Sequence, residues 1–301
     1  MPDHHLTASA GHRLADRLKD HGHAILPKAI APECIRAIEA LLQPTFTATP
    51  FCEGAFYGLR TKRFGRLLRR CEAIQELVLH PAILAAAEQL LSPWCDVIQL
   101  NLTQAIEIHP GAVAQFPHRD QDMWAGAKGE MEYLVNILWP LTPFTADNGA
   151  TRIWRNSHGP AAHDANEPSA PPLVAEALPG DAILFLGSTL HAAGANRTRF
   201  PRRAVIISYS LGWLKPFENP WLAYPPPIAR CFPRPLAELA GYRQHRPNLG
   251  NFEGQCPSIL LETDVPEHLA AIDALRPDQT AAVRAFAAAQ ADPPVDDRRK
   301  T

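Results

Sequence analysis

Two apolar runs decide the fold of this chain: Gly180-Asp-Ala-Ile-Leu-Phe185, which His191 follows, and Arg202-Arg-Ala-Val-Ile-Ile-Ser-Tyr209. Both runs are short, rich in β-branched or aromatic residues and preceded by turn residues, which is typical of buried strands. Far upstream lies Gln115-Phe-Pro-His118-Arg-Asp120. Together the three segments supply two imidazoles, one carboxylate and a downstream guanidinium.

Further strands are expected around these segments. Residues 97–108 alternate apolar and polar side chains, the mark of a half-buried strand. Other strands are expected at 133–139, 151–154, 173–175, 182–185 and 204–209. Several short strands separated by turn signals such as Asp147-Asn-Gly149 indicate an all-β sandwich or barrel.

The rest of the chain is expected to be helical or irregular. Helices are predicted around Leu14–Gly22, over 32–42 and over 81–91, and weaker ones near 236–240 and 277–289. We expect a single domain over 1–290: a helical part at about 9–92, a core at about 95–215 and a loop-rich part at 216–290. Residues 291–301 are polar and should form a frayed tail.

The composition limits the partners and the cellular location that we expect for this protein. The 301 residues carry a formal net charge of −2, so we expect no nucleic-acid partner. No apolar run approaches the roughly 20 residues of a membrane span, and the first residues lack a secretion-signal pattern. The six cysteines form no CxxC pair, which is typical of reduced thiols and predicts a cytoplasmic protein.

His118, Asp120 and His191 are the candidate metal ligands. In extended backbone His118 and Asp120 project to the same face, because they are two residues apart. Chance alone often supplies a His-x-Asp motif, so the third ligand matters. Two imidazoles and one carboxylate suit Fe(II) and leave positions open for other ligands, whereas zinc more often takes thiolates or a third histidine.

Arg202 opens an apolar strand and needs an anionic partner there, since an unpaired buried charge is costly. The far carboxylate of a dicarboxylic cosubstrate could supply it through a bidentate contact. The alternative is an ion pair with a local Asp or Glu. Arg203 has the opposite strand parity, so it should face outward and matter little to the site.

Weaker candidates surround this set. Gln104, Gln115 and Thr151 could contact the cosubstrate, although each could equally be an ordinary buried residue. Among the aromatic residues, Trp124, Trp213 and Phe217 could wall a substrate pocket, with Trp124 favoured. The basic cluster over residues 60–70 reads more readily as a solvated helical face than as a lid that offers a cation to substrate.

The motifs resemble those of the phytanoyl-CoA dioxygenase family of Fe(II)/2-oxoglutarate-dependent oxygenases. The matching pieces are His118-Arg-Asp120, Pro179-Gly-Asp181, and His191-Ala-Ala-Gly-Ala-Asn196 followed by Pro201-Arg-Arg-Ala204. In that family an arginine eleven positions after the distal histidine binds 2-oxoglutarate, which corresponds to Arg202. Asp120 argues against halogenation, because halogenating relatives have a small residue there.

The resemblance implies a double-stranded β-helix (jelly roll, cupin-like) core with the N-terminal helices packed outside. It also implies Fe(II), 2-oxoglutarate and O2, with decarboxylation of 2-oxoglutarate to succinate and CO2. We therefore expect an enzyme that hydroxylates or otherwise oxidatively tailors a small molecule, as a monomer or homodimer, with no catalytic group beyond the metal ligands. The alternatives are a cupin-like metalloenzyme that does not use 2-oxoglutarate, and a non-catalytic binding protein on the same fold.

Overall fold

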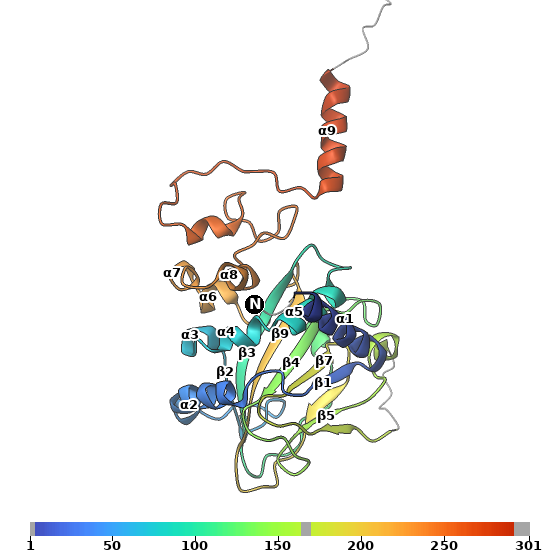
Figure 1. Cartoon of the computed structure of the whole chain (residues 1–301), viewed down its shortest axis with the longest axis vertical. Coiled ribbons are helices and arrows are strands. Elements are labelled where there is room, and N and C mark those ends of the chain that lie inside the picture. The colour runs from blue at the N-terminus through green and yellow to red at the C-terminus, as the bar shows by residue number, and fades with distance from the viewer. Residues whose placement is uncertain (1–3, 164–169, 292–301) are drawn as a thin grey trace, which may run out of the picture.

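A large antiparallel sheet forms the centre of the computed structural model, which describes residues 4–163 and 170–291. Its six strands follow the order β1-β7-β4-β9-β3-β2 and lie at the middle of the molecule in Figure 1. They are β1 (His23–Leu26), β2 (Thr61–Phe64), β3 (Ile98–Ile108), β4 (Leu134–Pro140), β7 (Ala182–Leu186) and β9 (Arg202–Leu211). The longest strands, β3 and β9, pair along almost their whole length.

A second, smaller sheet contains β6 (Leu173–Ala175), β5 (Thr151–Ile153) and β8 (His191–Ala193) in that order. Buried apolar side chains from both sheets meet in one cluster, including Leu138 of β4, Ile153 of β5 and Phe185 of β7. Burial of these side chains between the sheets stabilises their face-to-face packing. The two-sheet core with helices outside confirms the expected jelly-roll fold.

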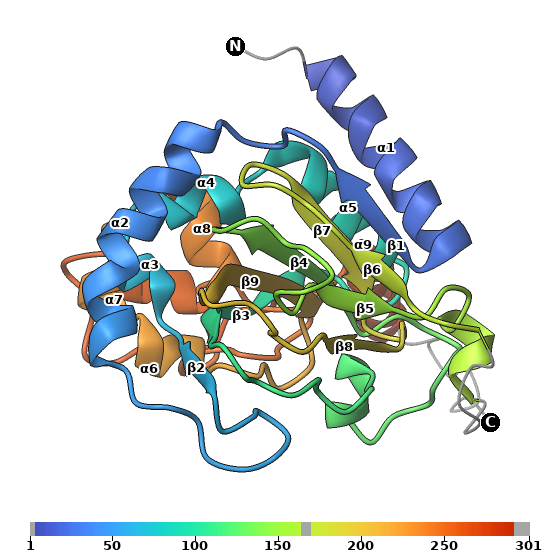
Figure 2. The same ribbon diagram turned by 90° about the horizontal axis from the view of Figure 1, so that it is seen from below.

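Helices flank the large sheet (Figure 2). The N-terminal ones are α1 (His4–His21), α2 (Pro32–Ala48), α3 (Leu67–Arg70), α4 (Ile74–Val78) and α5 (Pro81–Leu91). After β9 come α6 (Pro220–Ala223), α7 (Pro226–Ala229), α8 (Arg234–Leu239) and α9 (Pro277–Ala291), and α9 projects away from the sheets in Figure 1. Three 3-10 turns complete the elements: η1 (Asp120–Met123), η2 (Gly159–His163) and η3 (Pro257–Leu261).

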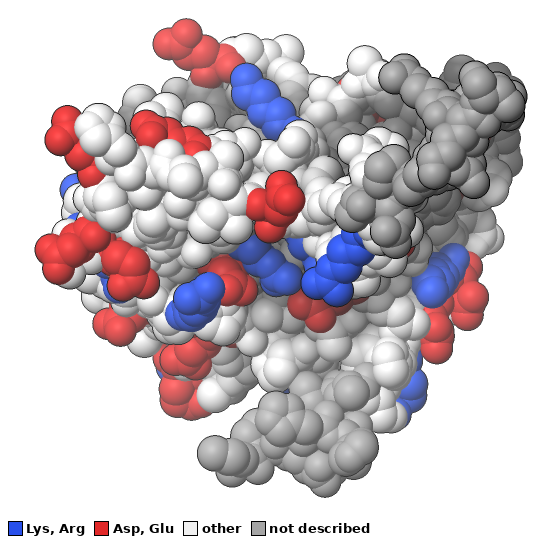
Figure 3. All heavy atoms as spheres, turned by 90° about the horizontal axis from the view of Figure 1, so that it is seen from above, with Lys and Arg blue, Asp and Glu red and all other residues white. Residues whose placement is uncertain are grey.

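The described helices and surface bear on the expected partners. Among residues 4–163 and 170–291, no helix is both long and apolar enough to cross a bilayer. On the face drawn in Figure 3, Lys and Arg side chains are interspersed with Asp and Glu and form no continuous basic field. Both observations agree with the balanced composition of the chain.

The structure corrects two expected elements. The helix predicted to end at 42 continues through Pro44 to Ala48, because Phe46 is fully buried and its ring packs edge-on against Phe64 at 4.9 Å between centroids. The 60–70 cluster is a solvated helical face only in part: Arg69 and Arg70 are exposed on α3, but residues 61–64 form β2, which pairs with β3. The division into domains stays a prediction, and the tail beyond Ala291 lies outside the described residues.

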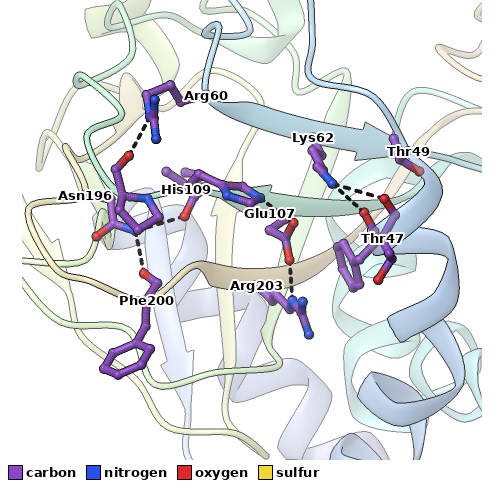
Figure 4. A network of polar contacts seen from close by, with 12 residues as sticks. Thr47, Thr49, Arg60, Lys62, Glu107, His109, Asn196, Phe200 and Arg203 are labelled. Atoms are coloured by element: carbon purple, nitrogen blue, oxygen red, sulfur yellow. Dashed lines mark hydrogen bonds and ion pairs between the residues drawn. The ribbon is translucent and has the colours of Figure 1, made fainter.

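A polar network covers the outer face of β2, β3 and β9. Figure 4 shows Arg203 bonded to Glu107, and Lys62 of β2 bonded to carbonyl oxygens of α2. Glu107 is buried and accepts hydrogen bonds from Arg203, its register partner, and from His109 at 2.6 Å. Arg203 also bonds Gln43 and pairs with Glu39 of α2 at 3.3 Å. Arg203 therefore faces outward as predicted, but it anchors a helix, so the expectation that it matters little applies only to the site.

Glu107→Ala should lower the free energy of unfolding by on the order of 2 kcal/mol, because it leaves the Arg203 guanidinium short of its buried partner. Urea denaturation measures the loss. Arg36→Ala is the matched control, since its ion pair with Glu33 is largely exposed and such pairs contribute about 0–1 kcal/mol. Equal losses in the two variants would contradict the structural role assigned to Glu107.

Candidate metal centre

Three side chains from two distant segments of the chain converge between the two sheets. One ligand atom from each of His118, Asp120 and His191 lies within 4.8 Å of the others. His118 and His191 form an antiparallel bridge, in which each backbone N–H donates to the other residue's carbonyl at 3.0 Å. Asp120 begins η1 directly after this bridge, so its carboxylate reaches the two rings.

Hydrogen bonds fix both imidazole rings. Nδ1 of His118 lies 2.9 Å from the Phe116 carbonyl, and Nδ1 of His191 lies 3.0 Å from the Thr189 carbonyl. A carbonyl can only accept, so each Nδ1 must carry the hydrogen. Each Nε2 then keeps its lone pair toward Asp120, at 3.3 Å for His118 and 3.6 Å for His191. Two imidazoles and a carboxylate in this arrangement fit Fe(II).

The charges of Asp120 and His191 favour metal binding. Burial would lower the pKa of His118, but the hydrogen bond and charge of Asp120 raise it, so a metal competes with a proton at this ring. Burial would raise the pKa of Asp120, but the neighbouring His191, His118 and Arg63 lower it to about 2, so the carboxylate is ionised at neutral pH. Burial is also the main cause that lowers the pKa of His191. His191 is therefore neutral at pH 7, as a metal ligand must be.

A cavity of about 360 Å³ adjoins the three donors. Every residue that the sequence predicted to contact the cosubstrate lines it, namely Gln104, Gln115, Thr151 and Arg202, and Phe217 lies on its wall. Both glutamine amides are engaged with protein groups. Gln104 Oε1 accepts from Arg63 at 3.3 Å, and Gln115 Nε2 donates to the Phe56 carbonyl at 3.3 Å.

Arg202 is buried, and no acidic residue within 4–163 or 170–291 pairs with it. Its guanidinium donates to the Gly149 carbonyl and stacks 4.2 Å from the centroid of the Phe144 ring, while its Nε has no hydrogen-bond partner. Burial, together with the positive charge of Arg63, lowers the pKa of Arg202 to about 9. Among the described residues no carboxylate pairs with it, so the alternative of a local ion pair is not realised there.

Arg63 is a second cation in the cavity, which the sequence analysis missed as an individual residue. It lies on β2 opposite Ile106 of β3, and its guanidinium stacks over Tyr57 at 5.0 Å. Its Nε is buried and has no hydrogen-bond partner in the part of the chain that the structure describes. Two signals in the sequence pointed toward Arg63. The basic cluster over residues 60–70 had a lid that offers a cation as its alternative interpretation, and the alternation in Thr61-Lys-Arg-Phe64 points Lys62 and Arg63 to opposite faces if the segment is a strand.

Two aromatic residues predicted for the substrate pocket lie elsewhere. Trp124 packs against the core beside Tyr133, and its indole N–H donates to the Lys215 carbonyl at 2.9 Å. The indole of Trp213 donates to the Trp94 carbonyl at 3.0 Å. Neither lines the cavity, because each indole is drawn toward a carbonyl outside it. Phe56, Tyr57 and Met123, which the sequence analysis did not single out, line it instead.

Comparison with known proteins agrees with this geometry. The sequence model of the phytanoyl-CoA dioxygenase family matches residues 18–204. The chain belongs to this family. Among its curated relatives, the dioxygenase trt7 of Aspergillus terreus is 32% identical over 204 residues, which cover 64% of this chain and 71% of trt7. The dioxygenase FrzG of a Cladobotryum species is 30% identical over 253 residues, which cover 75% of this chain and 81% of FrzG.

Solved structures support the family fold. The non-haem α-ketoglutarate-dependent epimerase SnoN, from nogalamycin biosynthesis, superimposes with a TM-score of 0.58 at 19% identity, covering 69% of this chain and 86% of SnoN. Such a low identity shows the fold alone. Family membership confirms the expected enzyme class, a 2-oxoglutarate-dependent non-haem iron dioxygenase, and with it the expected Fe(II), 2-oxoglutarate and O2.

Trp124→Phe should lower the free energy of unfolding by about 1 kcal/mol through loss of the indole hydrogen bond. Because Trp124 lies off the cavity, the affinity for Fe(II) and 2-oxoglutarate should not change. Urea denaturation and anaerobic titration measure the two quantities. Unchanged stability with altered 2-oxoglutarate affinity would instead place Trp124 in the site.

Proposed function

We propose that this enzyme hydroxylates a small, mostly apolar organic molecule, and that His118, Asp120 and His191 hold its iron. When bound there, Fe(II) together with 2-oxoglutarate and O2 would supply the oxidising chemistry, with succinate and CO2 as co-products. The observation that carries the proposal is Arg202: a buried guanidinium without a carboxylate partner shares one cavity with the three metal donors. An anionic cosubstrate would satisfy it.

The two cations of the cavity suggest how 2-oxoglutarate would lie. The charge of Arg63 lowers the pKa of Asp120, so Arg63 lies near the metal donors, whereas Arg202 is held against the Gly149 carbonyl and the Phe144 ring. Arg63 therefore suits the carboxylate at the metal end. Arg202 suits the far carboxylate, with which its planar fork can form two parallel bonds.

Three uncharged side chains near the two cations would help to fix this orientation of 2-oxoglutarate. Gln104 holds the Arg63 guanidinium through its side-chain carbonyl, so its role is to position that cation. Thr151 is buried on β5 and lines the same cavity, where its hydroxyl can donate to a carboxylate oxygen. Gln115 accepts from the Ala193 N–H at 3.3 Å and ties β8 to the segment that carries Phe56.

The cavity mouth indicates the class of substrate. Phe56, Tyr57, Met123 and Phe217 line it and are each at least a third exposed. Apolar groups of this kind bind apolar surface and gain little from charge. The carboxylate of Asp122, also on the lining, is already paired with Lys128 at 2.8 Å. These contacts favour an uncharged substrate with a largely apolar skeleton.

Anaerobic addition of Fe(II) and 2-oxoglutarate should produce their charge-transfer absorption band in the visible range. His118→Ala should abolish the band, because it removes one of three protein donors. His109→Ala is the control, since His109 lies beyond the end of β3 and bonds Glu107. The absence of a band in the wild-type protein, or an undiminished band in His118→Ala, would refute the assigned metal ligands.

Arg202→Met should weaken 2-oxoglutarate binding by on the order of 100-fold, the equivalent of about 3 kcal/mol in charge-assisted hydrogen bonds. Its stability without ligand should be equal or higher, because an apolar side chain replaces an unpaired buried charge. Arg203→Met should behave in the opposite way, with lower stability and unchanged affinity.

Titration of the charge-transfer band and urea denaturation measure the two effects. Unchanged 2-oxoglutarate affinity in Arg202→Met would overturn the cosubstrate role even if iron binding is intact. That result would favour a cupin-like metalloenzyme. If the wild-type protein bound neither Fe(II) nor 2-oxoglutarate, a non-catalytic binding protein would be favoured.

A further inference from the structure

Asn136 is a buried polar residue at the centre of the large sheet. It lies on β4 between Phe185 of β7 and Ser208 of β9, and none of its surface is exposed. Its side chain lines the cavity. A polar side chain among the apolar residues of Leu134-Val-Asn-Ile-Leu-Trp139 costs free energy unless it is hydrogen-bonded, so its contacts need an explanation.

Its amide contacts the candidate metal carboxylate. Nδ2 of Asn136 lies 3.0 Å from Oδ2 of Asp120. An ionised carboxylate can only accept hydrogen bonds, so the NH2 group must face it; the reverse amide orientation would bring two acceptor oxygens together. The remaining amide oxygen, Oδ1, is buried and has no partner among the described residues. The bond to Asp120 is thus the contact that fixes the amide.

Asp120 is the ligand that most needs such support. The backbones of His118 and His191 hold each other in a sheet bridge, and each ring is bonded to a carbonyl through Nδ1. Asp120 lies outside the strands, at the start of the 3-10 turn η1. A protein group thus bonds each of the three ligands, which is the usual arrangement at metal sites. For the histidines the bonded atom is Nδ1, whereas for Asp120 it is Oδ2, which also lies 3.6 Å from His191 Nε2 and so within reach of the metal position. For Asp120 that group comes from the rigid strand β4.

We propose that Asn136 is a positioning residue that keeps Asp120 Oδ2 out of the metal's coordination sphere, so that Asp120 binds through Oδ1 alone. This inference rests on the proposed metal site. Two imidazoles and one carboxylate oxygen occupy three of six positions, and a chelating 2-oxo acid would occupy two more. A second oxygen from Asp120 would fill the last position, which O2 needs. Asn136 thereby keeps that position free.

Mn(II) offers a test that does not depend on turnover or on the unknown substrate. With 2-oxoglutarate bound, the wild-type protein should leave one position for water, seen as broadening of the Mn(II) EPR signal in water enriched in oxygen-17. Asn136→Leu has a similar volume and no donor, so Oδ2 can also bind the metal and the broadening should disappear. Loss of this outer contact should also weaken Mn(II) binding by about 10–100-fold.

Ser208→Ala is the matched control, since Ser208 is the buried register partner of Asn136 and its hydroxyl accepts a hydrogen bond from Asn101 at 3.0 Å. It should keep the broadening. Asn136→Ser, which is smaller, gives the same measurement if the leucine variant does not fold. Retained broadening in the folded Asn136 variant overturns the proposal, whatever its affinity. If the wild-type protein binds neither Mn(II) nor 2-oxoglutarate, the proposed function falls instead.

Discussion

The backbone bridge between His118 and His191 is the constraint on which the site depends. Its two reciprocal hydrogen bonds join segments far apart in sequence and place the two rings 4.4 Å apart. The pairing continues where the Gln115 N–H donates to the Ala193 carbonyl at 3.0 Å. His118 thereby extends the smaller sheet at β8. The metal donors are consequently brought together only when this sheet closes over the large one, so folding of the core and assembly of the site are one event.

The interior of this core carries charges that the fold itself leaves incompletely compensated. Arg63 and Asp120 partly offset each other, but the Nε atoms of Arg63 and Arg202 have no hydrogen-bond partner among the described residues. Buried groups of this kind lower stability when they are left unpaired. An anion bound in the cavity would satisfy both guanidinium groups at once. The protein without ligand is therefore expected to be less stable because of these unpaired charges. Its site is already organised, so little reorientation is needed on binding.

Much of this site could be predicted from the sequence, because strand alternation is a local property. The parity of His118 with Asp120, and of Arg202 against Arg203, followed from a period of two and agrees with the structure. Arg63 was missed because β2 becomes a strand only through its pairing with β3. Trp124 was misplaced because proximity to Asp120 along the chain does not determine the direction of a side chain beyond a 3-10 turn. Asn136 is visible in the sequence as a polar residue inside an apolar strand. Only its contact with Asp120 in the structure shows what that residue does.

Arg202 and Arg203 show how one strand can separate function from stability. Their side chains leave β9 on opposite faces, and register sets their partners: Ile108 lies opposite Arg202, and Glu107 lies opposite Arg203. The inward guanidinium meets an aromatic ring and a carbonyl, and its charge remains available for a ligand. The outward guanidinium meets two carboxylates and an amide, and it holds α2 to the sheet. A shift of one residue in the register of β9 would exchange these environments, so the network on the outer face also secures the position of the cation in the cavity.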